Sequence, residues 1–179
     1  AHMTRERRSI PVSTLASGLP LALHTLVLRG DMPGPTVGIT AMIHGDEIEG
    51  LLILRELWRS IEPATVNGVI WMVPVVNPLA FDALSRNTPV DTLDLNRNFP
   101  GSRDGWLSEQ MAFAMAGEFL DKIDVLIDIH AGGTFPLVDY CYALNDHALS
   151  RAFLSELLYT PTQLYPGTAA GYATQRGVP

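Results

Sequence analysis

The sequence of 179 residues contains a single cysteine, Cys141, which excludes an internal disulfide framework and suits a reducing compartment. No apolar run approaches the ~20 residues of a membrane span, because Pro74, Asn77 and Pro78 interrupt the most hydrophobic stretch. Positive charge is also scarce: twelve Lys and Arg against nineteen Asp and Glu give a net charge of −7. Without a basic surplus, neither nucleic acid nor an anionic membrane is an expected partner.

The start of the chain lacks the apolar segment of a signal peptide, because charged residues occupy positions 5–8. Residues 1–3 (AHM) have the form of a remnant of expression cloning and are set aside. Residues 4–179 are long enough for one domain, and 47% hydrophobic against 17% charged residues predict a well-filled core. The sequence therefore predicts an acidic, globular, cytoplasmic protein.

Short apolar runs rich in β-branched residues alternate with amphipathic patterns along the chain. The runs predict three strands that are buried on both faces, at residues 36–43, 69–76 and 124–129. The amphipathic patterns predict three helices, at residues 47–61, 107–123 and 148–158. This alternation predicts an α/β fold, with a mostly parallel, mixed sheet and helices on both faces.

Residues 77–106 interrupt this alternation with a stretch that contains three prolines and no sustained periodicity. Irregular connections of that length are uncommon in compact domains and are usually functional where they occur. Part of the functional site is therefore expected in this loop.

Two histidines are predicted to reach the same edge of the sheet. His44 follows the first predicted strand, and Glu47 lies in the first turn of the next helix, with Gly45 expected to let the backbone turn sharply. His130 follows the third predicted strand, at the carboxyl edge where open α/β sheets bind ligands. Two imidazoles and one carboxylate, with a position left for water, are the ligand set of a catalytic zinc site. A His-x-x-Glu pair alone is more often a surface pair, and these ligands also admit other divalent ions, Fe(II) among them.

The long loop contains a polar motif, DLNRNFPG, at residues 94–101. The planar guanidinium of Arg97 suits a carboxylate, and the amide of Asn96 can donate a hydrogen bond beside it. Taken alone, the motif also fits an ordinary capped turn that ends in Pro-Gly.

Three motifs in this order, HGDE at 44–47, DLNRNFPG at 94–101 and DIH at 128–130, resemble those of the succinylglutamate desuccinylase/aspartoacylase family. This family is a deacylase branch of the zinc carboxypeptidase superfamily, and the resemblance spans roughly residues 36–179. It implies a carboxypeptidase-like α/β/α fold with one zinc ion per chain. The resemblance further implies a function for each motif, with His44, Glu47 and His130 as zinc ligands and with Asn96 and Arg97 holding the carboxylate of the substrate.

The resemblance also implies functions for residues around these motifs. Arg86 would polarise the scissile carbonyl and stabilise the oxyanion, although it also fits a solvated loop arginine. Asp94 would accept a hydrogen bond from His44 and orient its ring toward the metal. Apart from the resemblance, strand alternation puts Asp128 on the same face as His130 and makes it the other candidate for such a contact, although it also fits an ordinary carboxylate at the strand edge.

One feature of the family is missing from these residues. Family members use a glutamate on a later strand as general base and acid, whereas this sequence ends at Gly177-Val178-Pro179. Glu156 is the only glutamate after His130 and is expected on a solvated helix face. The catalytic domain at residues 4–179 is therefore expected to be incomplete, to lack the β-rich domain that follows, and to form the metal site without its proton shuttle.

The sequence and the resemblance together predict a zinc-dependent amide hydrolase that removes an acyl group from an N-acyl amino acid, a small-molecule substrate. One alternative is a metallocarboxypeptidase, with the same metal and the same carboxylate contacts but a peptide substrate. The other is a zinc-binding module without turnover. The sequence leaves the acyl group, the amino acid, the native metal and the oligomeric state open.

Overall fold

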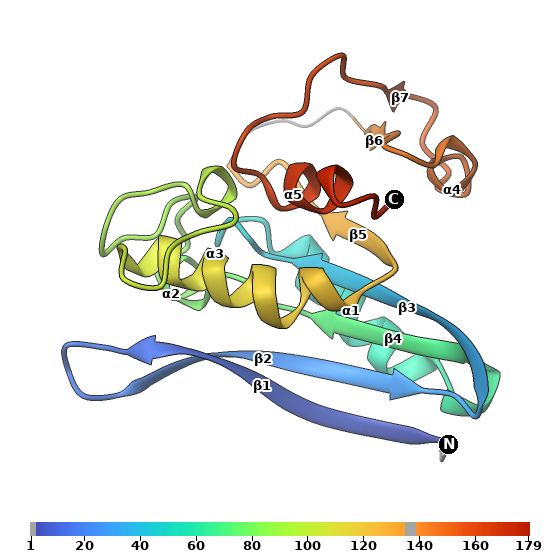
Figure 1. Ribbon diagram of the computed structural model, residues 1–179, viewed down its shortest axis with the longest axis horizontal. Coiled ribbons are helices and arrows are strands. Elements are labelled where there is room, and N and C mark those ends of the chain that lie inside the picture. The colour runs from blue at the N-terminus through green and yellow to red at the C-terminus, as the bar shows by residue number, and fades with distance from the viewer. Residues whose placement is uncertain (1–2, 135–138) are drawn as a thin grey trace.

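A five-stranded mixed sheet forms the centre of the protein (Figure 1), whose computed structural model describes residues 3–134 and 139–179. The strand order is β1-β2-β4-β3-β5. Strand β3 pairs in parallel with β4 and β5, whereas β2 pairs antiparallel with β1 and β4. The strands are β1 (Thr4–Thr14), β2 (Pro20–Arg29), β3 (Met32–Ala41), β4 (Asn67–Val73) and β5 (Val125–Ile129).

Helices cover both faces of this sheet, as the sequence predicts. Helix α1 (Glu49–Ser60) packs on one face, where Leu54 meets a buried cluster that includes Ile39 and Met72. Helices α3 (Leu107–Glu118) and α5 (Ala169–Gln175) lie on the opposite face in a second core. The α/β fold is therefore confirmed, and the three predicted strands and the first two helices are present with shifted ends. The shorter elements are α2 (Pro78–Asp82), α4 (His147–Ser150), β6 (Cys141–Tyr142), β7 (Leu158–Tyr159) and 3-10 turns at Pro63–Thr65, Leu95–Arg97 and Leu120–Lys122.

The prediction of a helix at residues 148–158 is wrong. Only α4 forms there, with the Asp146 side chain accepting hydrogen bonds from the first backbone N–H groups. Beyond it, Leu154 is 99% exposed and Phe153 is also exposed, so no core covers the apolar face that the pattern requires. A short amphipathic segment without a packing partner is not stable as a helix. Glu156, expected on this helix, lies instead in an exposed irregular segment.

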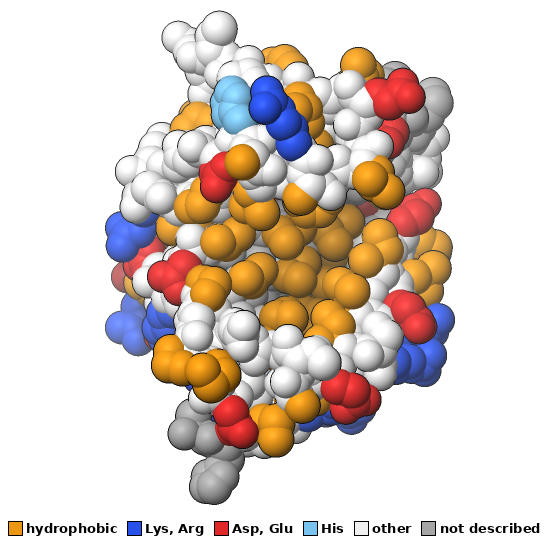
Figure 2. Space-filling view, turned by 90° about the vertical axis from the view of Figure 1, so that its right-hand side faces the viewer, with side chains coloured by type: hydrophobic (Ala, Val, Ile, Leu, Met, Phe, Trp, Pro, Cys, Tyr) orange, Lys and Arg blue, Asp and Glu red, His pale blue; other side chains and the backbone are white. Residues whose placement is uncertain are grey.

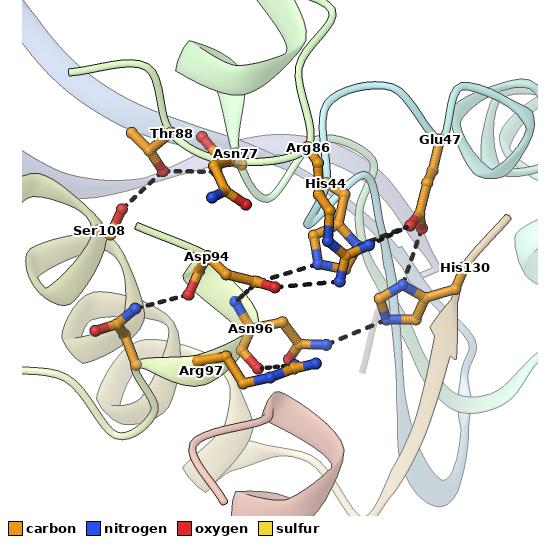
Figure 3. Close-up of polar contacts among 12 residues, drawn as sticks. His44, Glu47, Asn77, Arg86, Thr88, Asp94, Asn96, Arg97, Ser108 and His130 are labelled. Carbon is orange, nitrogen blue, oxygen red and sulfur yellow. Dashed lines mark hydrogen bonds and ion pairs between the residues drawn. The ribbon is translucent and has the colours of Figure 1, made fainter. Parts of the chain in front are cut away.

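The long loop is held in place by a buried polar network. Asn77 Nδ2 donates to Thr88 Oγ1 (2.9 Å), which in turn lies 2.7 Å from Ser108 Oγ (Figure 3). Asp91 accepts from the backbone N–H of Ser108 at the start of α3 (2.7 Å). Asn77, Thr88 and Ser108 are all fully buried. This network explains how the long loop, which contains α2 and the 3-10 turn at Leu95–Arg97, takes one conformation beside the sheet.

Replacing Thr88 with valine is expected to lower the free energy of unfolding by about 2 kcal/mol, because it leaves the buried Asn77 Nδ2 without an acceptor. Ser108 Oγ loses one of its two contacts and keeps the other, to Asp91 Oδ1 (2.9 Å). Urea unfolding of the wild type and the variant measures this difference. Thr14→Val, at an exposed strand end, is the matched control and is expected to change stability little. Equal unfolding free energies for Thr88→Val and the wild type would contradict this account of the loop.

One face of the molecule carries a broad central area of hydrophobic side chains with charged groups around it (Figure 2). At one edge of the sheet, all five residues of β5 are only half-buried. Apolar areas of this kind are typical of contact surfaces. Among the described helices, none is long and apolar enough to cross a bilayer.

Candidate active site

The site lies at the carboxyl ends of β3 and β5, which pair in parallel with Ala41 opposite Ile129. His44 follows β3 and His130 follows β5, so the two rings come together with centroids 5.1 Å apart. Glu47 precedes α1 and points toward both rings (Figure 3). The strand-end argument from the sequence thus brings these three side chains together, but Glu47 lies two residues before α1 and not in its first turn, as was expected.

The structure explains the glycine at position 45 by close packing and not by the sharp turn that was expected. Its φ lies outside the left-handed region, so the turn itself does not require glycine. Instead, a Cβ at this position would lie 2.0 Å from the carbonyl carbon of Ala80. Gly45 N–H donates to the Ser85 carbonyl (2.9 Å), which fixes the loop next to Arg86. Glycine therefore permits close approach between the first strand end and the long loop.

Glu47 connects the two histidines through its two carboxylate oxygens. Its Oε1 lies 2.7 Å from His44 Nδ1, and its Oε2 lies 2.9 Å from His130 Nδ1. Ala131 N–H also donates to Oε2 (3.1 Å), and the Glu47 side chain is only 4% exposed. Ligand atoms from the three side chains all lie within 4.8 Å of one another. No other group of three His, Cys, Asp or Glu side chains converges in this way within residues 3–134 and 139–179.

The outer nitrogen of each ring meets a second carboxylate. His44 Nε2 lies 3.1 Å from Asp94 Oδ1, and His130 Nε2 lies 3.1 Å from Asp128 Oδ2. The buried Thr40 hydroxyl donates to Asp128 Oδ1 (2.6 Å) and holds that carboxylate in place. Both Asp94 and Asp128 thus lie where carboxylates orient metal-binding histidines and direct Nδ1 inward.

Opposite charges perturb the pKa values of the whole cluster. Burial raises the pKa of Glu47, but hydrogen bonds to His130 and His44 outweigh it and lower that pKa to about 2. Burial lowers the pKa of His130, but Asp128 and Glu47 outweigh it and raise that pKa to about 10. The pKa of His44 is also raised, because Asp94 and Glu47 outweigh its burial. The carboxylates therefore stay ionised at neutral pH, which suits a divalent cation that displaces the imidazole protons.

Arg86 reaches this cluster from the long loop. Its Nη2 lies 3.1 Å from Asp94 Oδ2, and its Nη1 lies 3.5 Å from Glu47 Oε1 and 3.3 Å from His44 Nδ1. The side chain is 45% exposed, so it keeps one side open to a ligand. The structure therefore places Arg86 at the site and not in free solvent.

Asn96 and Arg97 lie on the 3-10 turn that the Asp94 side chain caps, with Asn96 beside His130. Asn96 is buried and its Nδ2 lies 3.4 Å from His130 Nε2. Arg97 is exposed, and its Nη1 donates to the Asn96 carbonyl (2.6 Å). The structure thus brings every sequence-predicted site residue to one region. Sequence analysis missed Thr40, although its position directly opposite Asp128 in the β3–β5 register follows from strand pairing.

The succinylglutamate desuccinylase/aspartoacylase catalytic domain matches residues 33–166, about three quarters of the chain. The chain belongs to this family. The family match begins within β3 and includes all the site residues named above.

Relatives in this family are longer than the chain. It is 38% identical over 133 residues to the N-alpha-acetyl-L-2,4-diaminobutyric acid deacetylase of Halomonas elongata, a match that covers 73% of the chain and 38% of that enzyme. The product-bound ectoine utilization protein EutE (DoeB) of Ruegeria pomeroyi superposes with a TM-score of 0.84 at 25% identity, over 97% of this chain and 57% of that one. The murein-tripeptide amidase MpaA of Escherichia coli O157 has a TM-score of 0.70 at 18% identity, over 99% of this chain and 81% of that one, and shows the carboxypeptidase-like fold alone. The chain thus spans about half the length of the family relatives that it matches.

Proposed function

We propose that the chain carries the metal and substrate site of a zinc-dependent amide hydrolase that removes an acyl group from an N-acyl amino acid. The observation that carries the proposal is the convergence of His44, Glu47 and His130 on one point, with Arg86 and the Asn96–Arg97 pair beside it. The homology to an enzyme named for deacetylating N-alpha-acetyl-L-2,4-diaminobutyric acid favours an Nα-acetyl amino acid as substrate.

The donor set fits zinc, since two imidazole nitrogens and one carboxylate oxygen leave a coordination position open. When bound, zinc supplies Lewis acidity, which polarises a carbonyl and lowers the pKa of water. Asp94 and Asp128 hold the two rings with Nδ1 inward, so the ligands are arranged before the metal arrives.

The remaining residues would bind and orient the substrate. Arg97 and the Asn96 amide would bind the carboxylate of the amino acid, because a guanidinium edge beside an amide donor matches its two oxygens. We refer to Asn96 and Arg97 as the carboxylate clamp. Arg86 would donate to the amide carbonyl oxygen and stabilise the charge that develops there during attack.

Proton transfer needs a further group. In the described part of the chain, the carboxylates that contact the two histidines are Glu47, Asp94 and Asp128, and each is engaged with an imidazole. We therefore propose that residues 4–179 are part of a catalytic domain and that a glutamate outside these residues transfers the proton.

A substrate panel tests the proposed function. The assay uses the longer protein that carries the proposed glutamate as well as residues 4–179. With zinc present, release of free amine is measured for Nα-acetyl-L-2,4-diaminobutyrate, N-acetylaspartate, N-succinylglutamate and blocked dipeptides. The N-acyl amino acids are expected to react, and Arg97→Leu is expected to lower kcat/KM by about 100-fold through loss of a charged contact. Arg103→Leu, an exposed loop arginine, is the matched control. Faster cleavage of dipeptides would indicate a carboxypeptidase, and stoichiometric zinc without any turnover would indicate a binding module.

Zinc binding is expected to release at least one proton at pH 7.5. In the metal-free protein, Asp128 and Glu47 outweigh burial and raise the pKa of His130 to about 10, so this ring carries a proton that a metal must displace. The pKa of His44 is raised in the same direction by Asp94 and Glu47. Zinc affinity should therefore rise with pH up to about pH 10. Calorimetry in buffers of different ionisation enthalpy measures the protons released. The His130→Gln variant should release fewer protons on binding zinc. His24 is exposed on β2, so the His24→Gln variant should release as many protons as the wild type. Binding heats that do not depend on the buffer would contradict the prediction.

A further inference from the structure

The segment Tyr165–Ala169, which leads into α5, lies against both residues of the carboxylate clamp. The guanidinium carbon of Arg97 lies 4.7 Å from the centre of the Tyr165 ring, a cation–π distance. The backbone N–H of Ala169 donates to Asn96 Oδ1 (2.9 Å). Residues about 70 positions apart in sequence therefore meet at the substrate side of the site.

Backbone contacts fix the segment itself. Gly167 has a φ of +73°, and a Cβ there would lie 2.1 Å from the Arg97 carbonyl oxygen, so glycine is required on both counts. The Gly167 carbonyl accepts from Phe99 N–H (2.9 Å), just after the clamp. Tyr165 is thus carried on a backbone that is tied to the same turn as Arg97.

These contacts define the direction in which the clamp donates hydrogen bonds. Because Ala169 N–H occupies Asn96 Oδ1, the amide presents its Nδ2 toward His130. The Arg97 guanidinium is held by the ring on one face and by the Asn96 carbonyl at Nη1. Tyr165 is 66% exposed, so its ring adds little to the core, and the ring instead lies against the Arg97 guanidinium of the proposed site.

We propose that Tyr165 is a positioning residue, whose ring holds the Arg97 guanidinium in the orientation that binds a substrate carboxylate. This inference rests on the proposed function, in which Arg97 binds that carboxylate. A guanidinium held in place loses less conformational freedom on binding, so a carboxylate ligand gains affinity without touching Tyr165 itself.

The test is binding, which does not depend on turnover. Dissociation constants of Nα-acetyl-L-2,4-diaminobutyrate and of its carboxamide analogue are measured by NMR titration of the zinc-loaded chain. Tyr165→Leu is expected to weaken carboxylate binding about three- to fivefold, the size of an exposed cation–π contact. Tyr165→Phe keeps the ring face and should bind like the wild type. Tyr159→Leu, an exposed tyrosine that packs on other tyrosines, is the matched control.

The double variant with Arg97→Leu separates this inference from the proposed function. In the Arg97→Leu background, Tyr165→Leu should cause no further loss of carboxylate affinity. The dissociation constant of the carboxamide analogue should be the same for the wild type and for each Tyr165 variant. If Arg97→Leu weakens carboxylate binding but Tyr165→Leu does not, or if the two losses add, the positioning role is wrong. If Arg97→Leu itself leaves carboxylate binding unchanged, the proposed clamp is wrong, and the inference fails with it.

Discussion

Replacing Glu47 with glutamine is expected to weaken zinc binding by about 100-fold or more, since even groups outside the ligand sphere change metal affinity ~10–100-fold. The carboxylate is the one anionic member of the proposed ligand set and lies between both Nδ1 atoms at 2.7 and 2.9 Å. Glutamine keeps the shape but loses the charge that a divalent ion requires. Competition with a chromophoric chelator measures the zinc affinity of each variant.

The control for this variant is Glu49→Gln. Glu49 is the first residue of α1 and is exposed, so its substitution alters the net charge equally without touching the cluster. Zinc affinity is expected to stay within twofold of the wild type, as for a screened surface charge. Equal losses for both variants would show that overall charge, and not the proposed ligand, explains the effect.

Replacing Gly45 with alanine is expected to lower the free energy of unfolding by about 3 kcal/mol, because overpacking against backbone cannot be relieved by a side-chain rotation. The added Cβ would lie 2.0 Å from the Ala80 carbonyl carbon and 2.3 Å from Phe81 N. Separation of these segments would move His44 and the loop that carries Arg86. Zinc affinity is therefore expected to fall together with stability.

Gly117→Ala is expected to have the opposite effect on the free energy of unfolding. Gly117 lies on the exposed side of α3 with nothing within 4 Å of an added Cβ, so alanine should stabilise by ~0.5–1 kcal/mol through helix propensity. Urea unfolding of both variants measures the two changes. A Gly45→Ala protein as stable as Gly117→Ala would contradict the close packing described here.

The convergence of His44, Glu47 and His130 was predictable because it follows from local rules. His44 and His130 each end a strand, and parallel neighbours deliver such residues to the same sheet edge. The motif that contains Asn96 and Arg97 was recognisable as a resemblance, although its position beside His130 depends on the loop conformation.

Other features depend on contacts that no local pattern encodes. The helix predicted at residues 148–158 has the right periodicity, but the fold offers no surface to cover Leu154. The position of Arg86 follows from the approach of Gly45 to Ala80 and from the buried network around Thr88. Likewise, the contact between Tyr165 and Arg97 joins distant segments, so only the folded chain reveals it.

The central claim is that His44, Glu47 and His130 together bind zinc, and X-ray absorption at the zinc edge tests it most directly. The chain loaded with one equivalent of zinc is expected to show two imidazole nitrogens and oxygen ligands at ~2.0–2.2 Å, with no sulfur. In His44→Ala and His130→Ala, the imidazole contribution should fall. A sulfur ligand at ~2.3 Å from Cys141, or a spectrum that both substitutions leave unchanged, would contradict the site described here.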